Sequence, residues 1–229
     1  MIALAVFDLD GTLAAPGKAM PAEELQLLLK LEEKGTQIAI SSGKPVFYLC
    51  GFARQLGLKD PILIGENGAV LQKGVELPPP LVKKAPIPPV TADALKQLRK
   101  KMEERFGSRL WFQPNETALT PFPAYAEDFP PLRKMIAEFL RPEYELCVYE
   151  HPDCFDVEYA RLTKKTGIEL LEELTGISPR DMVAVGDYTN DYPMLEAVGH
   201  SVGIHLPEKG HATVDLPDLK SALLHLLTL

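Results

Sequence analysis

The chain has 229 residues, and its 24 Lys and Arg residues against 32 Asp and Glu residues give a formal net charge of −8 at pH 7. Hydrophobic residues at 46% and charged residues at 24% are ordinary proportions for a globular protein, and they exclude a disordered chain or a coiled coil. The acidic balance argues against nucleic acid or an anionic membrane surface as a partner, because both require a basic patch.

The sequence also indicates where the protein resides. No apolar run approaches the roughly 18 residues of a membrane-spanning helix, and the first residues lack the basic segment that opens a signal peptide. Cys50, Cys147 and Cys154 are an odd number of cysteines and show no CxxC spacing. We therefore expect neither a disulfide framework nor a zinc ribbon, and we expect a cytoplasmic protein. These features do not indicate an oligomeric state.

The first 65 residues show the alternation of a β-α-β-α-β unit. Continuous apolar runs at 2–7, 37–41 and 61–65 are typical of strands buried on both faces, which belong to parallel sheets. Between them, residues 21–34 and 46–56 have helical spacing, and each segment ends at a glycine. Strands that alternate with helices in this way predict a parallel sheet with crossover helices.

The pattern changes at six prolines between residues 78 and 89, which predict a stiff linker. Beyond the linker, the sequence predicts a small α+β insert with the element order αββαββ. Its expected elements are a helix at 91–106, strands at 110–112 and 117–120, a helix at 130–140, and strands at 144–150 and 155–159.

The α/β pattern resumes after the insert. The expected elements are helices at 166–174, 191–198 and from 219 onward, and strands at 182–185 and 201–203. The sequence thus predicts an α/β protein with a Rossmann-like parallel-sheet core, formed by residues 1–80 and 158–229, and a smaller α+β domain at 81–157.

Two acids stand at the end of the first expected strand, in the segment Asp8-Leu9-Asp10-Gly11-Thr12. Parallel α/β sheets bind ligands at this edge, and residues two apart in extended chain point the same way, so both carboxylates can face one site. Two such acids repel each other unless a cation or a shared proton compensates. The pair indicates a nucleophile beside an acid/base, bridged by a divalent metal. A solvated acidic turn is the alternative.

Two more acids, Asp187 and Asp191, and the amide Asn190 follow the expected strand at 182–185. An Asn or Asp helix cap explains such a segment when it stands alone. Together with the first two acids, however, it brings four carboxylates to one edge of the sheet. That arrangement is destabilising without Mg²⁺, a hard cation that takes carboxylate and carbonyl oxygens.

Ser42 and Gly43 end the second expected strand, and Lys164 and Lys165 open the helix that leads to the later acidic segment. A hydroxyl together with free amides at a helix N-terminus can bind phosphate oxygens, although a plain turn is the more common meaning of a Ser-Gly pair. Lysines in a first helical turn oppose the helix dipole, which indicates an anionic partner for one of them. A solvated pair of lysines is the alternative.

Segments of this chain resemble the four motifs of the haloacid dehalogenase superfamily, in the same order: Asp8-x-Asp10-Gly11-Thr12, Ser42, Lys164 and Gly186-Asp187-x-x-Asn190-Asp191. The insert follows Glu66-Asn67-Gly68-Ala69, a placement similar to that in the Cof-type branch. That branch includes sucrose-phosphate, mannosyl-phosphoglycerate and archaeal phosphoglycolate phosphatases, and the expected αββαββ insert resembles its smaller cap, the domain that determines substrate specificity.

The resemblance implies catalytic and phosphate-binding roles. Asp8 would attack phosphorus and form an aspartyl-phosphate, and Asp10 would protonate the leaving oxygen and then activate water. Ser42, Gly43 and Lys164 would hold the phosphoryl group. The spacing of the residues that follow Lys164 resembles that of the family more closely than the spacing after its neighbour does.

The resemblance also implies a metal site and a function. Mg²⁺ would bind Asp8, Asp10 through its carbonyl, and Asp187, while Asp191 and Asn190 would orient the metal shell and the phosphate. The expected function is Mg²⁺-dependent hydrolysis of a small phosphorylated metabolite, a phosphosugar or a phosphoglycolate-like phosphomonoester. A sugar phosphomutase of the phosphomannomutase type and a phosphate-accepting signalling domain are the alternatives.

The chain departs from the family pattern at two places. The second motif usually reads Thr-Gly-Arg, and here Lys44 replaces the planar guanidinium of the Arg. A Met-Gly-Asn-Ala stretch often follows the fourth motif, and here residues 203–207 read Gly-Ile-His-Leu-Pro. We therefore assign no site residue in that segment.

Overall fold

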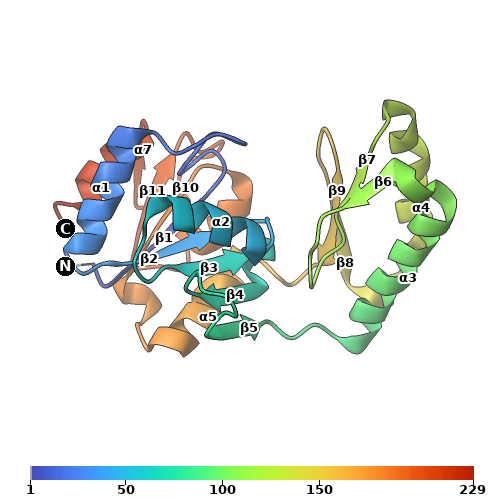
Figure 1. Ribbon diagram of the computed structural model, residues 1–229, viewed down its shortest axis with the longest axis horizontal. Coiled ribbons are helices and arrows are strands. Elements are labelled where there is room, and N and C mark those ends of the chain that lie inside the picture. Colours follow the sequence, from blue (N-terminus) through green and yellow to red (C-terminus); the bar gives the residue numbers. More distant parts are fainter. Residues whose placement is uncertain (1) are drawn as a thin grey trace. The chain divides into compact units, whose positions relative to one another are not determined.

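The apolar runs at the two ends of the chain form one eight-stranded sheet in a computed structural model that describes residues 2–229 (Figure 1). The strand order is β12-β11-β10-β1-β2-β3-β4-β5. The strands are β1 (Leu4–Asp8), β2 (Gln37–Ser41), β3 (Ile62–Gly65), β4 (Val70–Lys73), β5 (Leu81–Lys84), β10 (Met182–Gly186), β11 (His200–Ile204) and β12 (Val214–Leu216). All neighbours pair in parallel except β4, which is antiparallel to β3 and β5. The predicted α/β class is confirmed.

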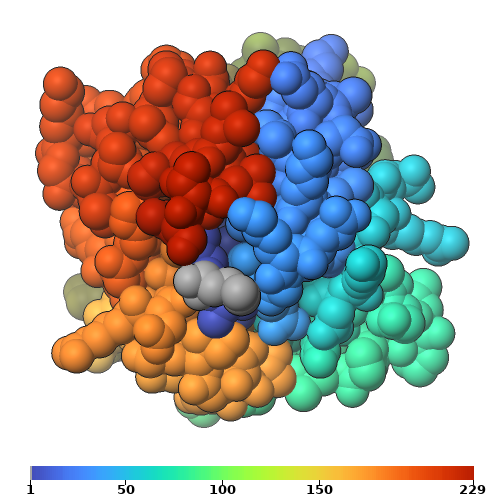
Figure 2. Space-filling view, turned by 90° about the vertical axis from the view of Figure 1, so that its left-hand side faces the viewer, coloured from blue at the N-terminus to red at the C-terminus, as the bar shows by residue number. Residues whose placement is uncertain are grey.

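Helices cover both faces of this sheet, which explains why its central strands are continuously apolar. On one face, α1 (Ala22–Glu33), α2 (Val46–Leu56) and α7 (Leu219–Leu226) enclose the main hydrophobic cluster. Figure 2 shows α7 in red beside α1 in blue, and the Nζ atom of Lys34 donates to the carbonyl of Leu227 at 2.8 Å.

The other face of the sheet carries α5 (Lys164–Thr175) and the short α6 (Tyr192–Leu195). Gly167 of α5 packs directly on Ile64 of β3, where a β-carbon would lie 2.7 Å from the Ile64 side chain. The helix that carries Lys164 is therefore held close to the sheet.

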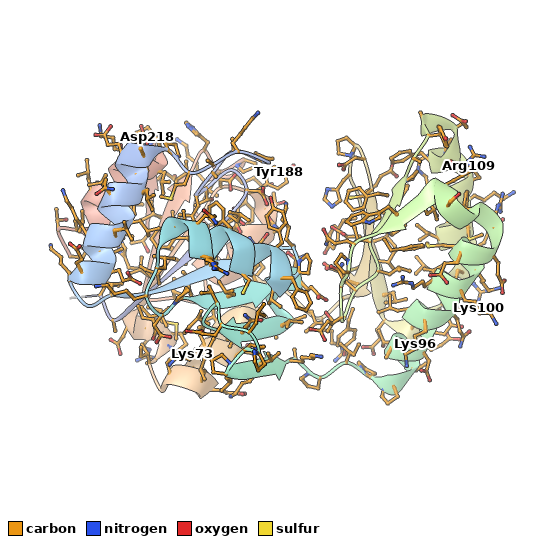
Figure 3. All side chains as sticks on the ribbon, viewed as in Figure 1. Lys73, Lys96, Lys100, Arg109, Tyr188 and Asp218 are labelled. Carbon is orange, nitrogen blue, oxygen red and sulfur yellow. The ribbon has the colours of Figure 1, made fainter. Side chains whose placement is uncertain are left out.

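Residues Pro86–Leu162 form a second compact unit with its own core, and the remainder of the chain forms the first. Its elements are α3 (Pro89–Phe106), β6 (Leu110–Phe112), β7 (Pro121–Pro123), α4 (Phe129–Phe139), β8 (Leu146–Glu150) and β9 (Phe155–Tyr159), in the αββαββ order that the sequence predicts. Apolar residues of α3 and α4 pack on one face of the two hairpins. The opposite side of α3 is exposed and carries Lys96 and Lys100 (Figure 3).

Several sequence expectations differ from the structure. The expected linker contains β5, which pairs with β4, so the first unit extends to Ala85 and the second to Leu162, rather than to residues 80 and 157. Prolines flank β5 and do not interrupt it, as an edge strand tolerates. Neither β4 nor β12 was predicted, β7 lies after the expected 117–120, and α6 is only four residues long.

Among residues 2–229, no helix combines the length and the apolar character that a membrane span requires.

Candidate active site

The carboxyl ends of β1, β2 and β10 bring the predicted site residues together. In the parallel register, Asp8 at the end of β1 lies opposite Ser41 at the end of β2. On the other side, Phe7 pairs with Val185 of β10, two residues before Asp187. This edge is where parallel α/β sheets bind ligands, because the strand ends present their loops side by side.

Lys164 is fully buried between two of the acids. Its Nζ atom lies 2.5 Å from Oδ1 of Asp8 and 2.6 Å from Oδ1 of Asp191. Burial alone lowers the pKa of Lys164, but the two carboxylates outweigh burial and raise its pKa above the ordinary value. The adjacent Lys165 is exposed. Of the two lysines that the sequence offered, the structure thus brings Lys164 to the acids.

Local backbone geometry places Lys164. It is the first residue of α5, after Thr163, whose amide donates to the hydroxyl of Thr166 at 3.3 Å. The carbonyl of Thr163 packs against Gly68, which has a φ of +99°, and a β-carbon on Gly68 would lie 2.4 Å from that oxygen. Only glycine allows this approach, so the turn at Glu66–Gly68 fixes where α5 begins.

The pKa of Asp8 is raised to about 7, chiefly by burial and also by the charges of Asp191 and Asp187, although Lys164 lowers it. One oxygen of Asp8 contacts Lys164, but the other, Oδ2, is buried and accepts no hydrogen bond from an N–H or O–H group of residues 2–229. Such an orphaned anionic oxygen is costly unless a cation or a proton occupies the position beside it.

Asp8, Asp187 and Asp191 each offer a carboxylate oxygen, and these oxygens lie within 4.8 Å of one another. Three hard oxygen donors around one point, with Oδ2 of Asp8 otherwise unpaired, fit a divalent cation such as Mg²⁺. Burial raises the pKa of Asp187, and the charge of Asp191 adds to that increase. A bound cation would reverse both effects because it favours the ionised carboxylates.

The two loops of the acidic motifs hold each other in place. Thr12 donates to Oδ1 of Asp187 at 2.8 Å, and Oδ2 of Asp191 accepts from the amides of Asp187 and Tyr188 at 2.9 and 3.0 Å. Gly11 has a φ of +99°, and a β-carbon there would lie 2.2 Å from Oδ2 of Asp187. The glycine of the first motif is therefore required by the close approach of the last motif.

Asp10 faces a cation that the sequence did not predict as its partner. Its Oδ2 atom lies 2.5 Å from Nζ of Lys44, and its carboxylate is not part of the cluster that Asp8, Asp187 and Asp191 form. Lys44 was noted only as a departure from a family pattern. No spacing rule could reveal this pair, because 34 positions separate the two residues and the fold alone joins them.

Ser42 is buried at the end of β2, and its hydroxyl accepts from the amide of Lys44 at 3.2 Å. The carboxamide of Asn67 packs over Gly43. The amides of Asn67 and Glu66 donate to the carbonyls of Ser42 and Lys44, both at 3.1 Å. Glu66 and Asn67 both have a φ of +53°. Their turn thus supports the loop in which the phosphate site was predicted. The sequence interpretation did not predict this supporting role.

Asn190 is exposed on the short turn Thr189–Asp191, as is Tyr188 (Figure 3). Within residues 2–229, no hydrogen bond joins Asn190 to Asp8 or to Lys164. The structure therefore brings the side chains of Asp8, Lys164, Asp187 and Asp191 together, whereas the side chain of Asn190, the residue before Asp191, is exposed on the same loop.

Comparisons with known proteins agree with this arrangement. The profile of the family of haloacid dehalogenase-like hydrolases matches residues 5–120 and 112–205. The phosphoglycolate phosphatase of Methanopyrus kandleri is 26% identical over 204 residues, which cover 88% of this chain and 84% of that protein. The phosphoglycolate phosphatase of Methanococcoides burtonii is 24% identical over 205 residues, which cover 87% and 81% of the two chains.

Solved structures share the whole fold. A haloacid dehalogenase-like hydrolase from Bacteroides thetaiotaomicron superimposes with a TM-score of 0.79 at 15% identity, over 100% of this chain and 99% of that one. A sugar phosphatase of subclass IIB of the same superfamily superimposes with a TM-score of 0.70 at 22% identity, over 99% of each chain.

The mostly parallel sheet, the acids at the carboxyl ends of its strands and the inserted αββαββ unit agree with the family whose profile matches the chain. The chain belongs to the haloacid dehalogenase-like hydrolase family, in its Cof-type branch, as its motifs indicated. It is an enzyme of the phosphoric monoester hydrolase class.

Proposed function

We propose that the protein is a Mg²⁺-dependent phosphatase of a small phosphorylated metabolite and that it acts through an aspartyl-phosphate on Asp8. The environment of Asp8 carries this proposal. Lys164 neutralises one of its oxygens, and the other is buried, unpaired and beside Asp187 and Asp191. A carboxylate in such a place is a nucleophile that is shielded from water and oriented by charge.

Asp8, Asp187 and Asp191, with the carbonyl of Asp10, would hold the metal. When bound, Mg²⁺ would neutralise negative charge on the phosphoryl oxygens and on the carboxylates around them. Lys164 would favour the ionised form of Asp8, because its buried ammonium lies 2.5 Å from the carboxylate, and the bound cation would favour that form further.

The reaction would proceed in two steps. In the first, an oxygen of Asp8 bonds to phosphorus as the ester P–O bond breaks, and Asp10 gives its proton to the leaving oxygen. In the second, Asp10 takes a proton from water as the water oxygen bonds to phosphorus, and the P–O bond to Asp8 breaks and releases phosphate. Ser42, Gly43 and Lys164 would hold the phosphoryl group during both steps, with Asn190 at the solvent side.

The second unit, Pro86–Leu162, would recognise the part of the substrate beyond the phosphate. Among the relatives of this chain are phosphoglycolate phosphatases and, by fold, a sugar phosphatase. A phosphorylated two-carbon acid and a phosphosugar are therefore the first candidates for its substrate.

Phosphate release from a panel of phosphomonoesters, with Mg²⁺ or with excess EDTA, tests the proposal. We expect turnover with Mg²⁺ and none with EDTA, and no turnover by Asp8→Asn in either. A reaction that requires a bisphosphate activator and transfers phosphate within a sugar would indicate a phosphomutase instead. Full activity in EDTA, with metal content checked, would contradict the metal site.

A further inference from the structure

The loop that joins β11 to β12, residues 205–213, includes part of the segment in which the chain departs from the family pattern. It starts at the edge of the sheet that carries the acids, because β11 is parallel to β10. At its far end, Thr213 accepts from the amide of Ser201 at 3.0 Å, and its own amide donates to the Ser201 hydroxyl at 3.1 Å. Both ends of the loop are therefore anchored to β11.

The middle of this loop contacts α6. The imidazole of His211 stacks on the ring of Tyr192, with 3.6 Å between the ring centroids and 5° between the planes. Its Nδ1 atom donates to Oε1 of Glu196 at 2.6 Å, and the amide of Glu208 donates to the Tyr192 hydroxyl at 3.0 Å. Tyr192 is the first residue of α6 and Glu196 directly follows its last, so the loop holds both ends of this helix. We call these three contacts the clasp.

The helix α6 depends on its surroundings for support. It has four residues, which is too short for a helix to be stable through its own hydrogen bonds. Met194 and Leu195 are buried and attach α6 to the core. Tyr192 and His211 are only half-buried, so the clasp supports the helix from the solvent side.

The support of α6 matters for the site because the helix begins directly after Asp191. Oδ2 of Asp191 accepts from the amides of Asp187 and Tyr188, which belong to the same loop. These bonds fix the shape of that loop but not its place relative to the first motif. Lys164 and Thr12 hold the loop from the side of the site, through Asp191 and Asp187 respectively. The clasp is its restraint on the other side.

We infer that His211 and Tyr192 are positioning residues for the reaction, because through α6 they hold the carboxylate of Asp191 in place beside Asp8. The inference goes beyond the proposed function and rests on its metal site for one consequence, the affinity for Mg²⁺. The three carboxylate oxygens of that site lie within 4.8 Å of one another, so a small displacement of Asp191 changes the donor set. Loss of a contact that orients a ligand typically weakens metal binding about 10–100-fold.

Hydrogen exchange of the full-length protein in EDTA provides the first test. The amides of Asp187 and Tyr188 donate to Asp191, so their protection reports the position of that side chain without metal or substrate. His211→Ala removes the stack and one hydrogen bond of the clasp, and it should speed the exchange of both amides by about tenfold or more. The amides of β1 should exchange as in the wild type. A role of His211 confined to its own loop would change exchange within residues 205–213 only.

Two further variants and a control make this test specific. His211→Phe keeps a ring that can stack on Tyr192 and should restore most of the protection. Tyr192→Phe keeps both rings and removes only the hydroxyl that accepts from Glu208, so it should speed exchange by about threefold. It also decides the matter if His211→Ala does not fold. Lys209→Ala, at an exposed residue of the same loop, is the matched control and should behave as wild type.

Calorimetric titration with Mg²⁺ provides a second readout that needs no turnover. His211→Ala should raise the Kd for Mg²⁺ about tenfold, whereas His211→Phe should remain within about threefold of wild type. Lys209→Ala should leave the Kd unchanged. A clasp that served stability alone would lower the thermal midpoint without this change in affinity.

The outcomes separate the inference from the proposed function. Absence of Mg²⁺ binding by the wild type would refute the proposed metal site, while hydrogen exchange would still decide the position of Asp191. Unchanged exchange of the Asp187 and Tyr188 amides in His211→Ala, or in Tyr192→Phe if the former does not fold, would overturn the inference alone. A wild-type Kd for Mg²⁺ in a His211→Ala protein with faster exchange would also overturn it, because the position of Asp191 would then not matter to the cation.

Discussion

The Nζ atom of Lys44 lies 2.5 Å from Oδ2 of Asp10, and the two side chains are 32% and 23% exposed. The ammonium also lies over the ring of Tyr48, 5.3 Å from its centroid. Lys44 therefore holds the proposed acid/base by a single contact, where a guanidinium would have formed two.

Loss of this contact should affect positioning more than chemistry. Lys44→Met should lower kcat about tenfold for an alkyl phosphate, because the leaving oxygen needs a well-placed acid. The effect on p-nitrophenyl phosphate should be smaller, since that leaving group needs little protonation. Lys44→Arg should restore most of the activity. Steady-state kinetics of the three proteins on both substrates provide the measurement, and equal kcat values for Lys44→Met and wild type would disprove the role.

Asp8→Asn should abolish turnover, because an amide is neither a nucleophile nor an anionic ligand. The expected loss in kcat exceeds about a thousandfold. Lys165→Ala, at an exposed lysine near the same site, serves as the control and should remain within about twofold of wild type. If Asp8→Asn retained more than a tenth of the activity in a phosphate-release assay, Asp8 would not be the nucleophile.

Removal of Lys164 should destabilise the protein strongly. Lys164→Met leaves the buried carboxylates of Asp8 and Asp191 without their cation, and breaking a buried pair in this way costs about 3–5 kcal/mol. Lys165→Met should change the free energy of unfolding by less than about 0.5 kcal/mol. Urea denaturation in EDTA measures both. Adding Asp8→Asn to Lys164→Met should recover part of the loss, and equal stabilities of the two single variants would contradict the expectation.

The metal-free protein should lose stability as the pH rises. Burial raises the pKa of Asp8 from 3.8 to about 7, so between these values the folded state binds more protons than the unfolded state. The free energy of unfolding should therefore fall by up to about 1.4 kcal/mol per pH unit between about pH 4 and pH 7. Urea denaturation in EDTA should show a shallower pH slope for Asp8→Asn, which has no carboxyl group to titrate at this position. The same slope in both proteins would contradict this assignment.

Stabilisation by Mg²⁺ should be larger at pH 8 than at pH 5, because the cation replaces the proton.

The second unit should be removable. Both ends of the insertion meet one turn of the first unit: the amide of Ala85 donates to the carbonyl of Ala69 at 2.8 Å, and Thr163 packs against Gly68. No residue of 86–162 belongs to the described hydrophobic cluster of the first unit. Replacing residues 86–162 with a short Gly/Ser linker should leave a folded core by circular dichroism. That core should lose far more kcat/KM for the true substrate than for p-nitrophenyl phosphate, and equal losses would mean that the insert does not select the substrate.

Sequence patterns predicted the elements whose burial is simple. The strand at 37–41 and the helix at 46–56 match β2 and α2 because both are largely apolar and end at residues that break the pattern, Ser42 after β2 and Pro45 and Gly57 around α2. β5 was missed because its burial alternates between half-buried and exposed residues and prolines surround it, which also describes a linker. β12, at the opposite edge of the sheet, has only three residues, which is too short for a pattern of apolar and polar residues to predict a strand.

The candidate site could be predicted where its residues follow strand ends, as Asp8 and Asp187 do, because topology brings such ends together. Contacts that depend on side-chain reach could not be predicted. The pairing of Lys44 with Asp10 and the exposure of Asn190 follow from loop conformations that no periodicity records. The left-handed Glu66–Asn67 turn is similarly invisible, since neither residue is glycine.

The position of β1 within the sheet has a consequence for local unfolding. Three strands lie on one side of it and four on the other, so its amides are protected from both edges. Fraying of β12 or β5 can exchange their amide hydrogens while β1 stays closed, and β1 should exchange only when the whole unit opens. Asp8 is thus attached to the part of the molecule that is the last to move, and heat or denaturant should loosen the edges of the sheet well before it disturbs the nucleophile.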